Sequence, residues 1–444
     1  MRKFLLFTAA IVVFAADPRL TPEMQAVADH ISADSLRGHL SFIASDALEG
    51  RGTPSRGLDL AAEYIASQFR RAGLEPAGDD GYFQTATLAV REQNPEHFEF
   101  TVFAEGKTIH IPPNETAIFP DKPIQFDNVP IKQTTRGVSI EGLDLPSVRE
   151  IRGSQAFDPE APRRPARNSI AAPELIDFLK NASDPRVTLH VLPRVEHSAT
   201  VRNVAGILRG SDAALQNTYV MLTAHYDHVG MGGSGPDRVF NGANDDGSGT
   251  VSVMEVAAAI ATRNPHPKRS ILFMAFFGEE LGDLGSHYYG RHPLVPLANT
   301  IADLNLEQIG RTDDSEGPQV GTATVTGFDF SDMTKVLVDA GTVTGIKVYK
   351  NEKNSDPYFA RSDNQALADM GVPAHTLGVA FDFPDYHGLG DEWQKIDYAN
   401  MAKVDRTVAI ALLRFASDAP PPQWNASNPK TRKYVEAAAK LHPK

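Results

Sequence analysis

The sequence predicts an α/β fold, a mostly parallel (mixed) sheet sandwiched by helices, with a smaller β-rich inserted domain. Two observations support this. After Asn203, continuous apolar segments of strand length alternate with helical segments, the pattern of a sheet covered on both faces. Between about Val90 and Ser198, short alternating runs such as FEFTVF and VTLHVL lie among Pro-rich stretches. The length of 444 residues suits one large domain plus a smaller one.

The individual elements follow from residue periodicity. One helix is expected over Thr21 to Ala44, and a second has apolar residues at helical spacing from Leu58 to Ala72, with Gly73 where a C-cap belongs. Later strands are expected at 218–224, 270–277, 300–306, 346–349 and 374–380. Helices are expected at 248–263, 283–292, 330–340, 364–371 and 401–415. Repeated strand and helix segments therefore fill the second half of the chain.

These patterns divide the chain into segments. We expect a catalytic domain formed by residues 17–90 and 199–418, a β-rich insert at 91–198, and a C-terminal tail at 419–444 that begins at a Pro-rich run. Residues 1–16 are expected to be a signal peptide, because Arg2 and Lys3 precede an apolar run that is shorter than the roughly 20 residues of a membrane-spanning helix. The protein is therefore predicted to be exported, either periplasmic or secreted, and not held in a membrane after cleavage.

Charge and cysteine content restrict the function. The formal net charge of -13 provides no basic field for nucleic acid, so the expected partners are not polynucleotides. The chain has no cysteine, so any zinc must be bound by histidines and carboxylates. Such ligands suit a catalytic site better than a structural one.

Metal-binding residue types follow several predicted strands. His225 and Asp227 follow the strand at 218–224, Glu279 and Glu280 follow the next, and Glu307 follows the third. Asp245 and Asp246 lie in a loop before a helix, and His387 lies in a late loop. Because ligands collect at the carboxyl ends of parallel strands, His225, Asp245, Glu280, Glu307 and His387 are expected to converge.

Two imidazoles and three carboxylates suit a pair of divalent ions about 3.5–4 Å apart. Mixed nitrogen and oxygen ligands favour zinc over magnesium or calcium, although manganese and cobalt fit the same ligands. A metal-bound water would be acidified and would attack a polarised carbonyl. Adjacent side chains at a strand end point apart, so Glu280 is expected to bind metal while Glu279 reaches the water as general base.

The ordered motifs HYDH, NGANDDGSG, FGEELGDLGS, NLEQIG and DYH resemble the co-catalytic zinc peptidases of metallopeptidase family 28. The resemblance covers about Asp46 to Val90 and Asn203 to Ala416. It implies that His225 and Glu307 bind one zinc, that Glu280 and His387 bind the other, and that Asp245 bridges both. The remaining implied roles are those of Glu279 as base, Asp227 as the carboxylate that orients His225, and Tyr386 as a hydrogen-bond donor to the oxyanion. Asp246 is expected at a helix N-terminus rather than on a metal.

Several positions depart from the family pattern or leave it open. Most members have Asp where this chain has Glu307, which predicts altered affinity at one ion or occupancy by a single zinc. Asn364 stands where related chains often carry His. The insert occupies the place of a protease-associated domain in exported relatives.

Three functions remain open from the sequence. The leading one is an aminopeptidase that removes N-terminal residues, predicted to be apolar, from peptides with two Zn²⁺ ions. The second is an acyl transferase of the glutaminyl cyclase type with one zinc, suggested by Glu307. The third, a binding ectodomain that has lost catalysis, is disfavoured because every ligand position and Glu279 carry His, Asp or Glu. The sequence sets no oligomeric state.

Overall fold

The computed structural model describes residues 20–148, 154–161, 165–232, 235–417 and 419–443. The predicted signal peptide, residues 1–16, lies outside these ranges. Across the described part of the chain, no helix combines the length and the apolar character needed to cross a membrane.

The large sheet has a parallel centre and antiparallel edges, which confirms the predicted mixed α/β fold. Its strands follow the order β21-β20-β22-β17-β13-β16-β12-β2-β9, and β1 also pairs with β12. The central strands β22, β17, β13 and β16 are parallel, whereas β12, β2 and β9 are antiparallel to their neighbours. The bounds are β1 Glu75–Pro76, β2 Phe83–Glu92, β9 Ser154–Phe157, β12 Val195–Leu208, β13 Tyr219–His225, β16 Ser270–Phe276, β17 Thr300–Leu306, β20 Thr322–Val325, β21 Lys347–Tyr349 and β22 Ala374–Gly378.

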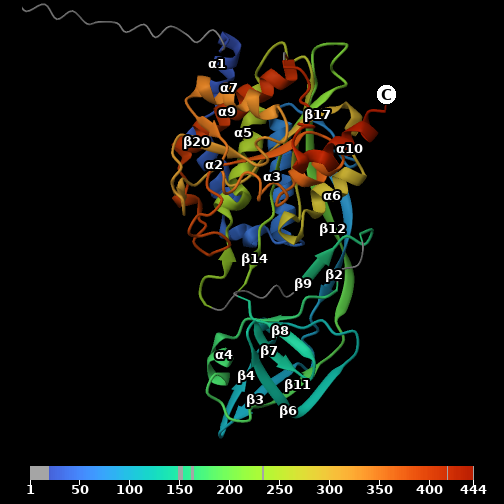
Figure 1. Ribbon diagram of the computed structural model, residues 1–444, viewed down its shortest axis with the longest axis vertical. Coiled ribbons are helices and arrows are strands. Elements are labelled where there is room, and N and C mark those ends of the chain that lie inside the picture. The colour runs from blue at the N-terminus through green and yellow to red at the C-terminus, as the bar shows by residue number, and fades with distance from the viewer. Residues whose placement is uncertain (1–19, 149–153, 162–164, 233–234, 418, 444) are drawn as a thin grey trace, which may run out of the picture.

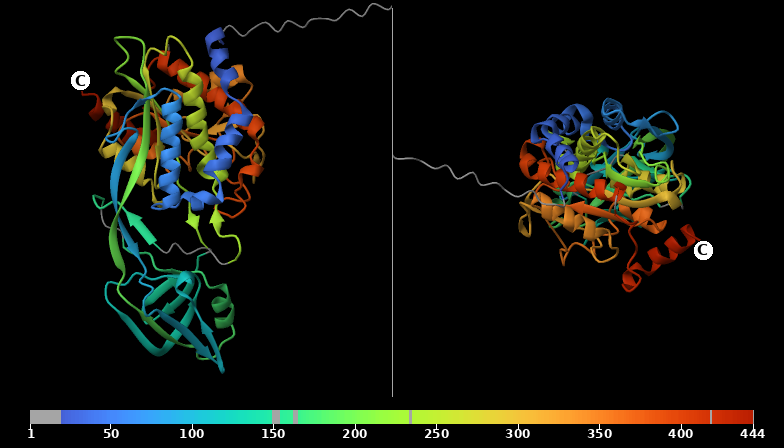
Figure 2. Two further views of the ribbon diagram at one scale, coloured as in Figure 1. Left: turned by 180° about the vertical axis from the view of Figure 1, so that it is seen from behind. Right: turned by 90° about the horizontal axis from the view of Figure 1, so that it is seen from above.

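Helices cover both faces of this sheet (Figures 1 and 2). Residues of β13 and β16 are buried throughout, because each strand lies between two helical layers. The larger core includes helices α1 Pro22–His30, α2 Ala33–Ile43, α3 Arg56–Arg71, α5 Gly249–Ala261, α7 Met333–Thr344 and α9 Tyr398–Ser417. The smaller core on the opposite face includes α6 Leu284–Arg291, α8 Asn364–Asp369 and α10 Arg432–Leu441.

Two segments differ from their predicted structure. The single helix expected over residues 21–44 is two helices, because the chain is extended at Ile31 and Ser32, and Ser32 caps α2 by accepting the Ser35 N–H at 3.1 Å. The expected C-terminal tail contains α10, and Trp424 and Tyr434 pack into the smaller core. The Pro-rich run therefore ends α9 but does not end the packed structure.

The β-rich segment forms a separate body at one end of the molecule (Figure 1). Its sheet has the order β4-β3-β11-β6-β7-β8 and a hydrophobic core of its own. The bounds are β3 Glu99–Ala104, β4 Lys107–His110, β6 Ile124–Thr134, β7 Gly137–Ile140, β8 Leu143–Pro146, α4 Pro173–Leu179 and β11 Arg186–Val191. The long paired strands β2 and β12 join the two bodies and cross the predicted boundaries near residues 90 and 198.

Candidate metal centre

Strand register brings the predicted site residues to one edge of the sheet. Thr223 of β13 pairs with Asn305 of β17, so His225 and Glu307, each two residues further along, leave the sheet side by side. Strand β16 lies on the other side of β13 and leads into a short 3-10 helix, η4 (Glu279–Leu281). Asp245 and His387 reach the same edge from outside the sheet, since Asp245 lies 3.5 Å from His225 and 3.1 Å from His387. All five predicted ligands and the predicted base therefore lie at the carboxyl ends of the central strands.

The ligand atoms form two adjacent groups. His225, Glu279 and Glu307 form one, and His228, Asp245, Glu280 and His387 form the other. The Asp245 carboxylate lies between them, with Oδ1 3.5 Å from His225 Nε2 and Oδ2 3.1 Å from His387 Nε2. Asp245 therefore lies within reach of ligand atoms of both groups.

His228 is the site residue that the sequence analysis missed. Its Nδ1 lies 2.9 Å from Glu280 Oε1, and His387 Nε2 lies 3.0 Å from the same oxygen. The available signal was the second histidine of HYDH, three residues after His225. His228 was not predicted as a ligand, because one ligand is expected after each strand and His225 takes that place.

Asp227 supports the first group, partly through its backbone. The His225 Nδ1 lies 3.2 Å from the Asp227 carbonyl oxygen and 3.5 Å from its carboxylate, so the Nδ1–H donates to the carbonyl and Nε2 is left for a metal. The Asp227 carboxylate accepts the Glu279 N–H at 3.1 Å and the Thr53 hydroxyl at 3.2 Å. This carboxylate thus fixes the backbone of the predicted base as well as lying near His225.

Asp246 belongs to neither group and accepts backbone N–H groups instead. Its Oδ1 accepts the N–H of Gly249 at 3.0 Å and of Gln308 at 3.1 Å. Asn364 also has a structural explanation. Its amide donates to the Phe359 carbonyl at 3.0 Å and accepts from the Thr376 hydroxyl at 2.8 Å, so it joins α8 to β22.

A buried arginine holds the backbone behind the centre. Arg51 is fully buried and donates to the carbonyls of Ile43, Tyr226, Asn241 and Gly242 at 2.6–2.9 Å. Burial lowers its pKa to about 10, with Asp227 and other nearby carboxylates opposing the shift, so it stays charged at neutral pH. The guanidinium therefore ties the N-terminal helices to the segments on either side of the ligands.

The electrostatics of the centre favour positive charge. Burial alone would lower the pKa of His225, but Glu279, Asp227 and Asp245 raise it well above its usual value. Burial also works against a charged His387, yet Asp245 and Glu280 raise its pKa to about 10. For Glu307, burial raises the pKa to about 7 despite His225. Closely packed carboxylates in a buried site are stabilised by cations, and divalent metals supply that charge.

The donor atoms fit a metal. Within the described residues, His225 Nε2, both ring nitrogens of His228 and Asp245 Oδ2 are buried and have no hydrogen-bond partner. Unsatisfied buried polar atoms are costly unless something binds them. Imidazole nitrogen together with carboxylate oxygen is the ligand chemistry of zinc in catalytic sites.

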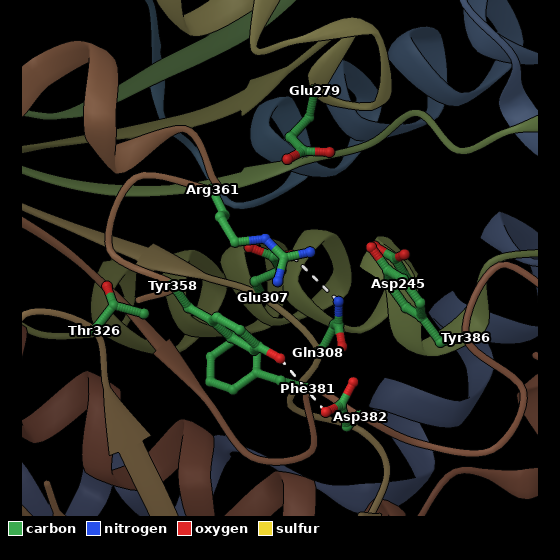
Figure 3. Close-up of a pocket in the computed structure, with 10 residues that line it drawn as sticks. All are labelled: Asp245, Glu279, Glu307, Gln308, Thr326, Tyr358, Arg361, Phe381, Asp382 and Tyr386. Carbon is green, nitrogen blue, oxygen red and sulfur yellow. Dashed lines mark hydrogen bonds between the residues drawn. The ribbon is translucent and has the colours of Figure 1, made fainter. Parts of the chain in front are cut away.

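A pocket opens beside the first group (Figure 3). It is lined by Asp245, Glu279 and Glu307 together with Gln308, Thr326, Tyr358, Arg361, Phe381, Asp382 and Tyr386. The Tyr386 ring stacks on His387 with centroids 4.1 Å apart, and burial, then the nearby carboxylates, raises its pKa. Tyr386 therefore keeps its proton and can donate it in a hydrogen bond.

A second cleft borders the other group. Its walls are β9 and neighbouring residues of the insert on one side, and η4 with α6 on the other, and Glu280 lies on its edge. Arg291 of α6 pairs with Asp158, and His292 Nε2 lies 3.0 Å from Glu160, so this part of the insert is attached to the catalytic domain. The insert therefore stands next to the metal centre.

Comparisons with known proteins relate part of this chain to a peptidase family. Residues 203–412 match the model of peptidase family M28. A probable leucine aminopeptidase 2 from Aspergillus oryzae is 26% identical over 267 residues, which cover 54% of this chain and 49% of that protein. A vacuolar membrane protease from Ajellomyces capsulatus is 31% identical over 120 residues, which cover 24% of this chain and 11% of that protein. The chain therefore matches about half the length of one curated relative and a small part of the other.

Solved structures share the fold. A zinc aminopeptidase from Bacillus subtilis aligns with a TM-score of 0.58 at 18% identity, over 87% of this chain and 96% of that one. An aminopeptidase from Aneurinibacillus aligns with a TM-score of 0.57 at 17% identity, over 90% of this chain and 97% of that one.

Proposed function

This chain carries a peptidase family M28 domain over residues 203–412 and is a hydrolase, and from that premise we propose that it is an aminopeptidase that uses two zinc ions. The observation that carries the proposal is the position of Asp245, whose two carboxylate oxygens face different groups of ligands. His225 and Glu307 would hold one ion, and Glu280 and His387 the other. Bound zinc supplies a polarised carbonyl and an acidified water.

The roles of the remaining residues follow from their positions. Glu279 lies in the pocket with its carboxylate 3.8 Å from His225 Nε2, and burial raises its pKa well above the usual value. A carboxylate with a raised pKa is a better proton acceptor, so Glu279 takes the proton of the attacking water and passes it to the leaving amine. The Asp227 carboxylate positions Glu279 by accepting the Glu279 backbone N–H. Tyr386 donates a hydrogen bond to the oxyanion.

The substrate is a peptide whose N-terminal residue enters the pocket of Figure 3. The rings of Tyr358, Phe381 and Tyr386 line its wall and suit the apolar side chain that the sequence analysis predicts. We also propose that the protein is exported, because residues 1–16 have the pattern of a signal peptide.

A peptide panel tests the proposal. The purified chain is incubated with free-amine and N-acetylated forms of the same peptides, before and after dialysis against a chelator, and released amino acids are measured. We expect release of N-terminal residues from free-amine peptides only, loss of this activity on chelation, and its return with Zn²⁺. Release of C-terminal residues, or pyroglutamate formation from N-terminal Gln peptides without hydrolysis of other peptides, would replace the aminopeptidase assignment.

A further inference from the structure

His228 is a buried histidine whose Nδ1 faces the Glu280 carboxylate. Both ring nitrogens are inaccessible to solvent, and in the described residues Nε2 has no hydrogen-bond partner. Its backbone is fixed, because the His228 N–H donates to the Arg51 carbonyl at 3.3 Å. An imidazole buried in this way needs a partner on at least one nitrogen, because an unpaired buried polar group is destabilising.

The environment of the ring points to a cation as that partner. Nδ1 lies 2.9 Å from Glu280 Oε1 and 3.9 Å from Asp245 Oδ2, and the ring meets His387 edge to face with centroids 5.4 Å apart. Two atoms that each lie about 2.0–2.1 Å from one tetrahedral zinc are separated by roughly 3.3 Å. The spacings around Nδ1 scatter about that value, and Nε2 of the same ring has no hydrogen-bond partner in the described residues.

The backbone is shaped to admit this ring. Gly242 has a φ of 57°, and a Cβ at this position would lie 2.4 Å from His228 Cγ. Gly242 also gives its carbonyl to Arg51 at 2.9 Å, so the backbone beside the ring is held in place. The absence of a side chain at residue 242 therefore leaves room for His228 against the metal centre.

We propose that His228 is the fourth protein ligand of the ion held by Asp245, Glu280 and His387, and that the two ion sites consequently differ in kind. A zinc with four protein ligands is closed and tightly held, whereas a zinc with three keeps a position for water. The site of His225, Asp245 and Glu307 is then the open, catalytic and more exchangeable one. This inference rests on the two-ion part of the proposed function but does not depend on the peptide substrate.

Metal affinity tests the proposal without relying on activity. The parent chain and His228→Ala are loaded with Zn²⁺, dialysed against chelators of increasing strength, and assayed for zinc by atomic absorption. For the parent we expect two release steps, with one ion retained by weak chelators. In H228A the retained ion should bind at least about 10-fold more weakly, as expected when a ligand contact is lost. His375→Gln, which removes another fully buried imidazole outside both ligand groups, should keep both steps.

Two outcomes overturn the proposal. Parental zinc affinity in a folded H228A variant, judged by circular dichroism, would reduce His228 to a neighbour of Glu280. If H228A does not fold, a crystal structure of the zinc-loaded parent decides, because Nδ1 must lie about 2.0–2.1 Å from the ion. Two tightly bound ions without any peptide hydrolysis would instead refute the proposed function and leave this inference standing.

Discussion

The Asp391 carboxylate accepts the backbone N–H of Asp245 at 3.0 Å and that of the preceding residue, Asn244, at 2.9 and 3.1 Å. Asp391 is buried, and burial raises its pKa to about 6 although these N–H groups and His228 favour the charged form. Since the Asp245 carboxylate lies between the two ligand groups, its main-chain position affects the whole centre.

Asp391→Asn is therefore expected to weaken zinc binding about 10- to 100-fold without removing any direct ligand. The amide keeps one acceptor oxygen but loses the charge that strengthens hydrogen bonds to backbone N–H groups. Competition with a fluorescent zinc chelator measures the affinity. The exposed Asp34→Asn, which only loses an ion pair with Arg37, is the matched control. Equal zinc affinity in D391N and the parent would contradict the supporting role.

Glu279→Gln is expected to lower kcat by about 10²–10⁴ while both zinc ions stay bound. Glutamine fills the same space but accepts no proton from the water. Turnover of an aminoacyl-nitroanilide and zinc content are measured on the same sample. Activity within a few-fold of the parent would exclude Glu279 as the base.

Glu307→Gln tests the ligand whose side chain is longer than the usual family residue. The variant is expected to retain about one zinc per chain and to lose turnover, because the ion beside His225 loses its carboxylate. Atomic absorption after dialysis gives the stoichiometry. Retention of two ions under conditions that leave two in the parent would show that Glu307 is not a ligand.

Arg51→Met is expected to lower the free energy of unfolding by roughly 3–5 kcal/mol, because four buried carbonyls lose their charged donor. Arg51→Lys should recover little, since an ammonium has three donors and a different shape. Urea unfolding of zinc-free protein measures the effect apart from metal binding. The exposed Arg37→Met, which breaks a surface ion pair, should cost no more than about 1 kcal/mol. Similar values for R51M and R37M would refute the prediction.

His375 gives the fold a defined sensitivity to acid. Its Nδ1 donates to the Thr326 carbonyl at 2.8 Å, and its Nε2 accepts from the Ser331 hydroxyl at 2.6 Å, an arrangement that requires the neutral ring. Burial lowers its pKa to about 4, whereas the unfolded chain has the usual value of about 6.5. Between these values the unfolded state binds the extra proton, so stability is full above about pH 6.5 and falls toward pH 4, by roughly 3 kcal/mol.

The measurement is the free energy of unfolding between pH 7 and 4 for the zinc-free parent and for His375→Gln. The variant will be less stable at pH 7, but its stability should fall less steeply over this range. Parallel pH profiles would show that His375 has the same pKa in the folded and the unfolded state, and would contradict the prediction. Zinc-free samples are needed because ligand histidines also titrate here.

Periodicity predicted the sheet and most helices because apolar runs of strand length admit few other structures. It failed where a local polar contact decides, as at Ser32, whose side chain starts a new helix inside a continuous apolar pattern. Of the five predicted ligands, three followed from strand ends and two from loop motifs, whereas His228 was not predicted, because its place depends on the close approach of its ring to Gly242. The residues that line the pocket were also not predicted from the sequence. Tyr358, Arg361 and Phe381 lie outside the described helices and strands, where one sequence carries little information on position.

The four hydrogen bonds of Arg51 all end on main-chain oxygens. Since a carbonyl is present whatever residue carries it, these bonds do not depend on the identity of the side chains of Ile43, Tyr226 and Asn241. Substitutions near the centre can therefore change its side chains and substrate contacts. The Arg51 guanidinium still holds the backbone beneath them in the same position.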